Sequence, residues 1–91
     1  MERIEFVCAD ATGVIEFGYV EVEIGGEYIT IQIEQYSGGG ESFYVDTLED
    51  KETLQSVGVE FDTESILKID GPEELLIDLF DYYTFESGKN R

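Results

Sequence analysis

Carboxylates make up nearly all of the side chains in this chain that could do chemistry. The sequence holds 22 Asp and Glu residues against 5 Lys and Arg, has no histidine, and has a formal net charge of −17 over 91 residues. Carboxylates act as paired acid and base in glycoside hydrolysis, ligate calcium, or pair with basic side chains of another macromolecule. The spacing of the acids and the residues around them decide among these three roles.

Catalysis is disfavoured by the residue types that are absent. Without histidine, the chain lacks the commonest general base and has no Ser-His-Asp or Cys-His nucleophile system. Residues Ser37 to Gly40 have no following lysine, so we expect a hairpin loop rather than a phosphate-binding loop. Cys8 lies in an alternating apolar pattern and is expected to be a small core residue. A short chain without tryptophan leaves little room for a sugar cleft, so we expect no enzymatic activity and no cofactor.

Metal binding is not indicated either. An EF-hand loop needs acids at fixed offsets, a central glycine and a terminal glutamate. The acidic runs at 46–52 and 60–64 do not match this pattern, and the other acids are spread along the chain. We therefore expect no dedicated metal site.

The composition predicts one folded domain over residues 1–91. Hydrophobic residues make up 42% and aromatic residues 13%, whereas a disordered acidic tail has few aromatic and β-branched residues. Residues 87–91 are expected to form a short mobile tail. The single cysteine favours a reducing cytoplasm, the first residues show no secretory signal, and no apolar run approaches the ~20 residues that cross a bilayer.

The first half of the chain alternates as a β-meander does. Strands are expected at residues 3–9, 14–24, 27–35 and 42–46. Gly25-Gly26 is a two-residue hairpin signal between the second and third of them. A further short strand is expected at 65–69.

The strand expected at 14–24 has a fault in its alternation. Its apolar residues fall into two groups of opposite parity: Ile15 and Phe17, and Val20, Val22 and Ile24. A shift of one residue moves every side chain to the other face of a sheet. We therefore predict a bulge near Gly18-Tyr19, which would bring both groups to one face.

The second half is expected to be mainly helical. Thr47 and Asp50 resemble a capping box, which predicts a short helix at 48–56. Pro72 is a good first helical residue, and the apolar residues after it recur at helical spacing, which predicts a helix at 72–85. The buried stripe of this helix is expected to comprise Leu75, Leu76, Leu79, Phe80 and Tyr83. The predicted fold class is α+β, an antiparallel meander of four to five strands with the C-terminal helix packed on one face.

The acids are expected to lie on the solvent-facing sides of these elements. Alternate strand residues are ~6.6–6.8 Å apart and helical i, i+4 residues ~6 Å apart along the axis, spacings comparable to alternate phosphates of DNA. Outward tyrosines supply apolar area and a hydroxyl to an interface, although tyrosine also simply suits strand surfaces. The predicted partner-binding residues are Glu16, Glu21, Glu23, Tyr28, Glu34, Tyr44 and Asp46 on the strands and Glu74, Asp78 and Asp81 on the helix.

In length, acidity and lack of catalytic residues, the chain resembles the small acidic phage proteins that mimic DNA, including anti-CRISPR and anti-restriction inhibitors. The resemblance covers the whole chain as composition, and these inhibitors share no residue motif that could be carried over. It implies a protein that occupies the DNA- or RNA-binding surface of a nuclease complex in the cytoplasm of a bacterial host cell. The partner is then a basic protein, with no direct contact to nucleic acid or membrane.

Two other interpretations fit the same residues. An immunity protein, an antitoxin or an accessory subunit would also use acids to bind a basic protein partner. A salt-adapted housekeeping domain would be acidic because salt screens the repulsion. The sequence leaves open the partner, the oligomeric state and which acidic patch binds.

Overall fold

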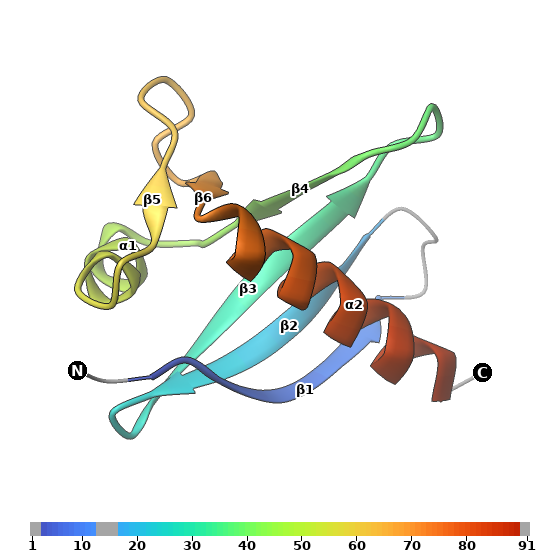
Figure 1. Cartoon of the computed structure of the whole chain (residues 1–91), viewed down its shortest axis with the longest axis horizontal. Coiled ribbons are helices and arrows are strands. Elements are labelled where there is room, and N and C mark those ends of the chain that lie inside the picture. Colours follow the sequence, from blue (N-terminus) through green and yellow to red (C-terminus); the bar gives the residue numbers. More distant parts are fainter. Residues whose placement is uncertain (1–2, 13–16, 90–91) are drawn as a thin grey trace.

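The structure, a computed structural model, describes residues 3–12 and 17–89 and consists of a sheet covered on one face by a long helix (Figure 1). The antiparallel sheet has the order β1-β2-β3-β4 and comprises β1 (Glu5–Ala11), β2 (Phe17–Ile24), β3 (Glu27–Gln35) and β4 (Glu41–Tyr44). Helix α2 (Glu73–Lys89) contacts β1 and β2. The predicted α+β class, with an antiparallel meander and a C-terminal helix on one face, is confirmed.

Three short elements lie between β4 and α2. They are helix α1 (Leu48–Gln55) and the two-stranded pair β5 (Glu60–Phe61) and β6 (Ile69–Gly71). The predicted helix at 48–56 is confirmed, and the Thr47 hydroxyl caps it by accepting a hydrogen bond from the Asp50 N–H at 3.1 Å.

The strand predicted at 65–69 is wrong for most of its length. The Ser65 N–H donates to Asp62 Oδ2 at 3.1 Å, and the Lys68 N–H donates to the Ser65 carbonyl at 2.8 Å. The second bond joins residues three positions apart, which is the bond of a β-turn rather than of a strand ladder. Regular pairing with β5 resumes only at Ile69, in β6.

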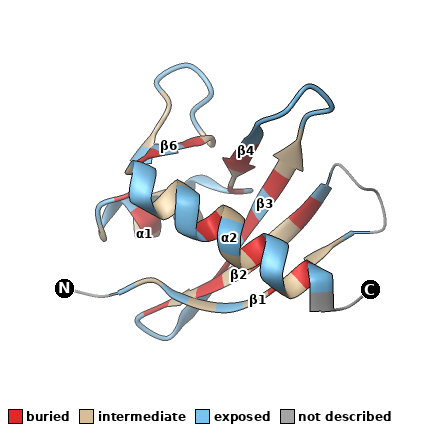
Figure 2. Ribbon diagram, turned by 45° about the vertical axis from the view of Figure 1, so that its right-hand side comes forward, coloured by how far each residue is buried: buried red, intermediate tan, exposed pale blue. Residues whose placement is uncertain are grey.

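The core lies between the sheet and α2 (Figure 2). Leu79 and Tyr83 are buried on the helix, whereas Leu75, Leu76 and Phe80 are half-buried against the core, so the predicted stripe does face the sheet. The sheet contributes alternate residues, as expected for a sheet with one buried face. These buried strand residues are Ala9, Val20, Val22, Ile24, Ile29, Ile31, Ile33 and Phe43.

Helix α2 continues beyond its predicted end at residue 85. Its last turns are held against the core because Tyr83 and Ser87, one turn apart, are both buried. Two residues of the predicted tail, Asn90 and Arg91, lie outside the described residues. No helix among residues 3–12 and 17–89 is both long and apolar enough to span a membrane.

The Gly25-Gly26 hairpin is confirmed. Both residues have positive φ angles, 57° and 88°, which glycine adopts without steric cost. Ile24 pairs with Glu27 across this turn, and the pairing then runs without interruption to Phe17 opposite Glu34.

The bulge predicted near Gly18-Tyr19 is wrong for the described part of the strand. The pairing of β2 with β3 has no irregularity there, and Gly18 continues the buried parity of Val20. Phe17 therefore points away from the core and is 47% exposed. Ile15, the other residue of that parity, lies outside the described residues. The register shift occurs instead in β1, between Phe6 and Cys8.

Gly18 permits a very close approach between helix and sheet. A Cβ atom added there would lie 2.5 Å from the Tyr83 hydroxyl oxygen and 2.7 Å from the Asp10 carbonyl oxygen, and it would also overlap Tyr83 Cε1. The Tyr83 ring thus occupies the space of a side chain in β2. Gly18 therefore marks a close approach between helix and sheet and not a bulge. These are the two common explanations for a glycine inside a strand.

We predict that Gly18→Ala destabilises the fold. The added methyl group must displace a buried ring or the backbone, and overpacking of this kind costs about 1–3 kcal/mol. Gly38→Ala is the matched control, because nothing lies within 4 Å of its added Cβ. Urea denaturation of the three proteins measures the effect, and equal midpoints for Gly18→Ala and the wild type would contradict the packing role of Gly18.

Candidate functional site

The face of the sheet opposite α2, here called the open face, has no described element packed across it (Figure 1). The open face comprises the side chains of β2 and β3 that point away from α2, together with the residues of β1 and β4 that lie opposite them in the sheet. They are Glu5, Cys8, Asp10, Phe17, Tyr19, Glu21, Glu23, Tyr28, Thr30, Gln32, Glu34, Ser42 and Tyr44. Acids and aromatic rings make up most of this set.

Most of the predicted strand residues come together on the open face. Glu21, Glu23, Tyr28, Glu34 and Tyr44 belong to it. Asp46, just after β4, joins it because its Oδ1 accepts a hydrogen bond from Gln32 Nε2. The remaining strand prediction, Glu16, lies outside the described residues.

The predicted helix residues form a separate patch. Glu74, Asp78 and Asp81 are all exposed on α2, which covers the other face of the sheet. The two acidic patches therefore belong to opposite layers of the molecule. A partner that lies flat against one layer contacts one patch only.

Several functional candidates were missed by reasoning on the sequence. Phe17, Tyr36, Glu5 and Asp10 bring further rings and carboxylates to the open face or its border. The bulge interpretation assigns Phe17 to the core, because it moves that side chain to the opposite face. If β2 is taken as an uninterrupted strand, Phe17 and Tyr19 are alternate residues and point to the same, outward face of the sheet.

A cluster of hydroxyl groups lies at one border of this face, where β4 pairs with the end of β3. The Tyr36 hydroxyl lies 2.7 Å from Ser42 Oγ, and Ser42 is buried. Hydrogen bonding to Tyr36 raises the pKa of Tyr44. A hydrogen bond with Ser42 offsets part of this effect, and burial and the nearby Glu34 charge add to the rise. Tyr44 therefore stays a neutral hydroxyl at physiological pH and adds no charge to the surface.

The carboxylates of the open face have no basic partner within the described parts of the chain. The bases whose side chains the structure describes are Arg3, Lys51 and Lys68. Lys51 on α1 lies over the Phe61 ring, 5.4 Å from its centroid. The Ser65 N–H is the main cause of the lowered pKa of Asp62, and the Lys68 charge adds to it, which places Lys68 near the β5–β6 turn. Lys51 is thus engaged away from the open face, whereas Lys68 pairs with Tyr44 in an isolated antiparallel bridge at the β4 border of that face.

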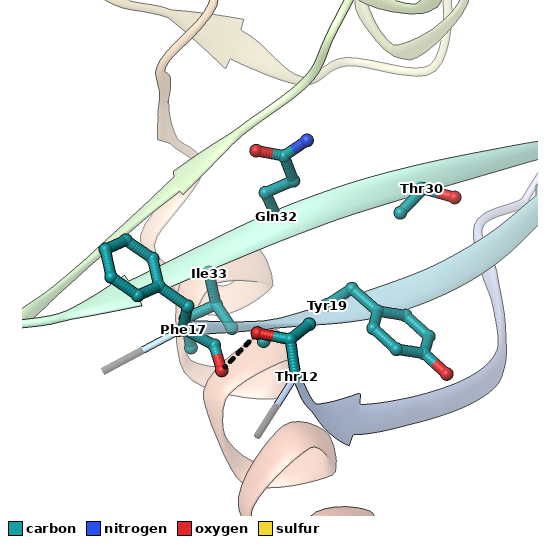
Figure 3. A pocket seen from close by; sticks show the side chains of 7 residues that line it. Thr12, Phe17, Tyr19, Thr30, Gln32 and Ile33 are labelled. Carbon is teal, nitrogen blue, oxygen red and sulfur yellow. Dashed lines mark hydrogen bonds between the residues drawn. The ribbon is translucent and has the colours of Figure 1, made fainter. Parts of the chain in front are cut away.

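A shallow depression of about 300 Å³ lies between the rings (Figure 3). Phe17, Tyr19, Thr30 and Gln32 line it from neighbouring positions on β2 and β3, and the Thr12 hydroxyl donates to the Phe17 carbonyl at 3.3 Å at its edge. Its lining holds no carboxylate pair that could act as acid and base. The depression suits the insertion of a flat side chain more than catalysis.

No metal centre is evident in the described ranges. They contain no group of three or more His, Cys, Asp or Glu residues arranged to hold a metal ion. Acids that alternate along one strand are held ~6.7 Å apart at the backbone, which spreads their carboxylates instead of gathering them around one ion. The open face is therefore organised as an extended surface rather than as a point site.

The prediction that Cys8 is a core residue is wrong. The shift between Phe6 and Cys8 places Val7 as an additional residue in β1, so Cys8 pairs with Glu21 on the open face and Ala9 takes the core position. Cys8 Sγ lies 3.9 Å from Glu21 Oε1. Burial raises the pKa of the thiol, and the charge of Glu21 raises it further.

Comparison of the chain with protein-family models, curated proteins and solved structures finds no match in any of the three.

We predict that Cys8 reacts slowly with thiol reagents. The thiolate is the reactive form, and a raised pKa lowers its fraction at pH 8. The rate of alkylation by iodoacetamide should be below that of free cysteine in the native protein. Glu21→Gln removes the adjacent charge and should accelerate the reaction, with Asp78→Asn on the opposite layer as the control. A native rate equal to that of free cysteine would contradict the altered environment of Cys8.

Proposed function

We propose that this protein is a non-enzymatic acidic inhibitor that mimics nucleic acid and occupies the basic DNA- or RNA-binding surface of a bacterial defence nuclease complex, of the anti-CRISPR or anti-restriction type. The observation that supports the proposal best is a sheet face on which carboxylates without a described basic partner lie among tyrosines. Such a face offers a basic groove both the charge and the ring surfaces that it is built to bind.

The charge density of the molecule supports the proposal. Its longest dimension is 35 Å, and its formal net charge is −17. Double-stranded DNA has one negative charge per ~1.7 Å of axis, so about 20 charges fall on the same length. A basic protein surface that binds about one turn of DNA duplex therefore experiences a similar electrostatic field from this protein.

The rigidity of the scaffold supports it as well. The backbone that carries these carboxylates is already fixed by strand pairing, so a partner has to order only their side chains. Long-range attraction between the acidic protein and a basic groove would also raise the association rate and make it depend on salt. Inhibition by occupancy benefits from both properties, since the inhibitor competes with nucleic acid for the groove.

We expect neutralisation of both acidic patches to abolish inhibition without unfolding the protein. The test variant combines Glu21→Gln, Glu23→Gln, Glu34→Gln, Glu74→Gln, Asp78→Asn and Asp81→Asn, all on solvent-facing positions. Each lost charge-assisted contact should weaken binding by on the order of 1 kcal/mol. The measurement is DNA cleavage by a panel of purified restriction and RNA-guided nuclease complexes, with displacement of labelled duplex as a second readout.

The control for this test combines amide substitutions of Glu49, Glu52 and Glu64, which lie on α1 and near the β5–β6 turn. These changes remove charge away from both patches and should leave inhibition nearly unchanged. If the wild-type protein inhibits and displaces DNA from none of the complexes, the proposed function is wrong.

The wild-type protein should remain folded at low salt. Its buried residues form one contiguous apolar core, and its acids are spread over both layers, so their repulsion does not have to be screened for the fold to persist. Circular dichroism at about 10 mM salt, where the Debye length is ~30 Å, should match the spectrum at high salt. Unfolding on dilution of salt would instead favour a salt-adapted housekeeping domain.

A further inference from the structure

One local arrangement recurs on the open face: an aromatic ring directly opposite a carboxylate on the neighbouring strand. Three pairs follow this rule: Asp10 with Tyr19, Glu23 with Tyr28, and Glu34 with Phe17. Directly opposite residues have Cβ atoms ~4.5–5.5 Å apart, so each ring lies beside its carboxylate. The acids are thus distributed among the rings rather than gathered into one cluster.

The rings of these pairs are accessible. Tyr28 is 63% exposed and Phe17 47%, and Tyr19 is half-buried in the lining of the depression that it shares with Phe17. Exposed apolar side chains that are grouped on one surface, rather than scattered singly, mark an interaction site. The grouped rings, together with the carboxylates beside them, indicate an interface that is both apolar and negative.

A guanidinium group satisfies both halves of each pair at once. It is planar, stacks on aromatic rings, and donates paired hydrogen bonds to a carboxylate. A lysine ammonium is a compact, strongly hydrated point charge and cannot offer a flat face to the ring. Ring–carboxylate pairs therefore distinguish arginine from lysine, which acids alone do not.

The three pairs form a ladder along β2. Their members on this strand are Phe17, Tyr19 and Glu23, and the ring of the third pair is supplied by Tyr28 on β3. At the rise of a β-strand, the first two pairs are ~6.7 Å apart and the third lies ~13 Å farther along, so the ladder spans ~20 Å. This length matches an extended or helical basic segment rather than a single side chain.

The helix patch lies on the opposite layer and would contact a different part of any partner. Glu74, Asp78 and Asp81 lie three or four residues apart on α2, so they form a row along one helix. The pairs of the open face instead join residues on two neighbouring strands. A partner seated on the open face cannot reach them, because the sheet itself lies between. Only one of the two patches can form the centre of a flat interface.

We propose that the open face docks an arginine-rich segment of the basic partner, with guanidinium groups stacked on Phe17, Tyr19 and Tyr28 and paired with Glu34, Asp10 and Glu23. This inference rests on the proposed function and adds to it the docking face and the chemistry of the partner. The charge complementarity of the face and the accessibility of its rings support this occupant.

Isothermal titration of the full chain with an arginine homopeptide and a lysine homopeptide of equal length tests the inference. We expect the arginine peptide to bind more tightly at physiological ionic strength. Tyr28→Leu should weaken arginine binding about two- to fivefold, the size of an exposed cation–π contact, and weaken lysine binding by less, because an ammonium group cannot stack flat on the ring. Tyr28→Phe keeps the ring and should retain the preference for arginine.

Phe85→Leu is the matched ring control, because Phe85 on α2 is 64% exposed against 63% for Tyr28. Glu23→Gln removes the carboxylate opposite Tyr28 and should weaken binding of the arginine peptide. Asp78→Asn on α2 is its charge control, and neither control should change the preference for arginine. The inference would be overturned if the two peptides bound equally tightly. It would also be overturned if the sheet variants and the helix variants lost the same affinity for the arginine peptide. Either result would leave the inhibitor function standing. Nuclease inhibition by the wild-type protein is measured in parallel, and its absence counts against the proposed function and not against the peptide preference.

Discussion

The packing of one helix on one face of the sheet is the constraint from which the rest of this structure follows. Leu79 and Tyr83 of α2 are buried together with the alternate residues of the strands, and Gly18 lets the Tyr83 ring approach the backbone of β2. Within residues 3–12 and 17–89, no second layer packs on the other face of the sheet. The other face of the sheet is therefore left to solvent, and its residues are free of the demands of core packing.

The elements that could be predicted are those whose signals are local. The two glycines of the hairpin, Pro72 before α2 and Thr47 before α1 each act within one turn of the backbone, and each defines its element correctly. The register of β2 on β3 was equally accessible, because a two-residue turn pairs residues at equal distances on either side of it. That rule alone places Glu23 opposite Tyr28 and Phe17 opposite Glu34.

The parts that could not be predicted depend on contacts between distant segments. Glycine inside a strand indicates either a bulge or a close approach, and only the position of Tyr83 decides for Gly18. The irregularity in β1 left no trace in the sequence, because Phe6, Val7 and Cys8 are all apolar and a change of parity among them is invisible. The pairing of Asp10 with Tyr19 depends on that irregularity, so this part of the candidate site could not be derived.

The arrangement of charge on the open face is difficult to explain by stability alone. Glu5 lies directly opposite Glu23 in the antiparallel pair of β1 and β2, and like charges at such positions destabilise a sheet. A base at either position would convert this repulsion into attraction without disturbing the core, since both side chains lie on the open face. The same holds along β2, where Glu21 and Glu23 follow one another on that face with no described base beside them. A sequence that retains such repulsion at positions free to change is consistent with selection for a partner that supplies the missing positive charge.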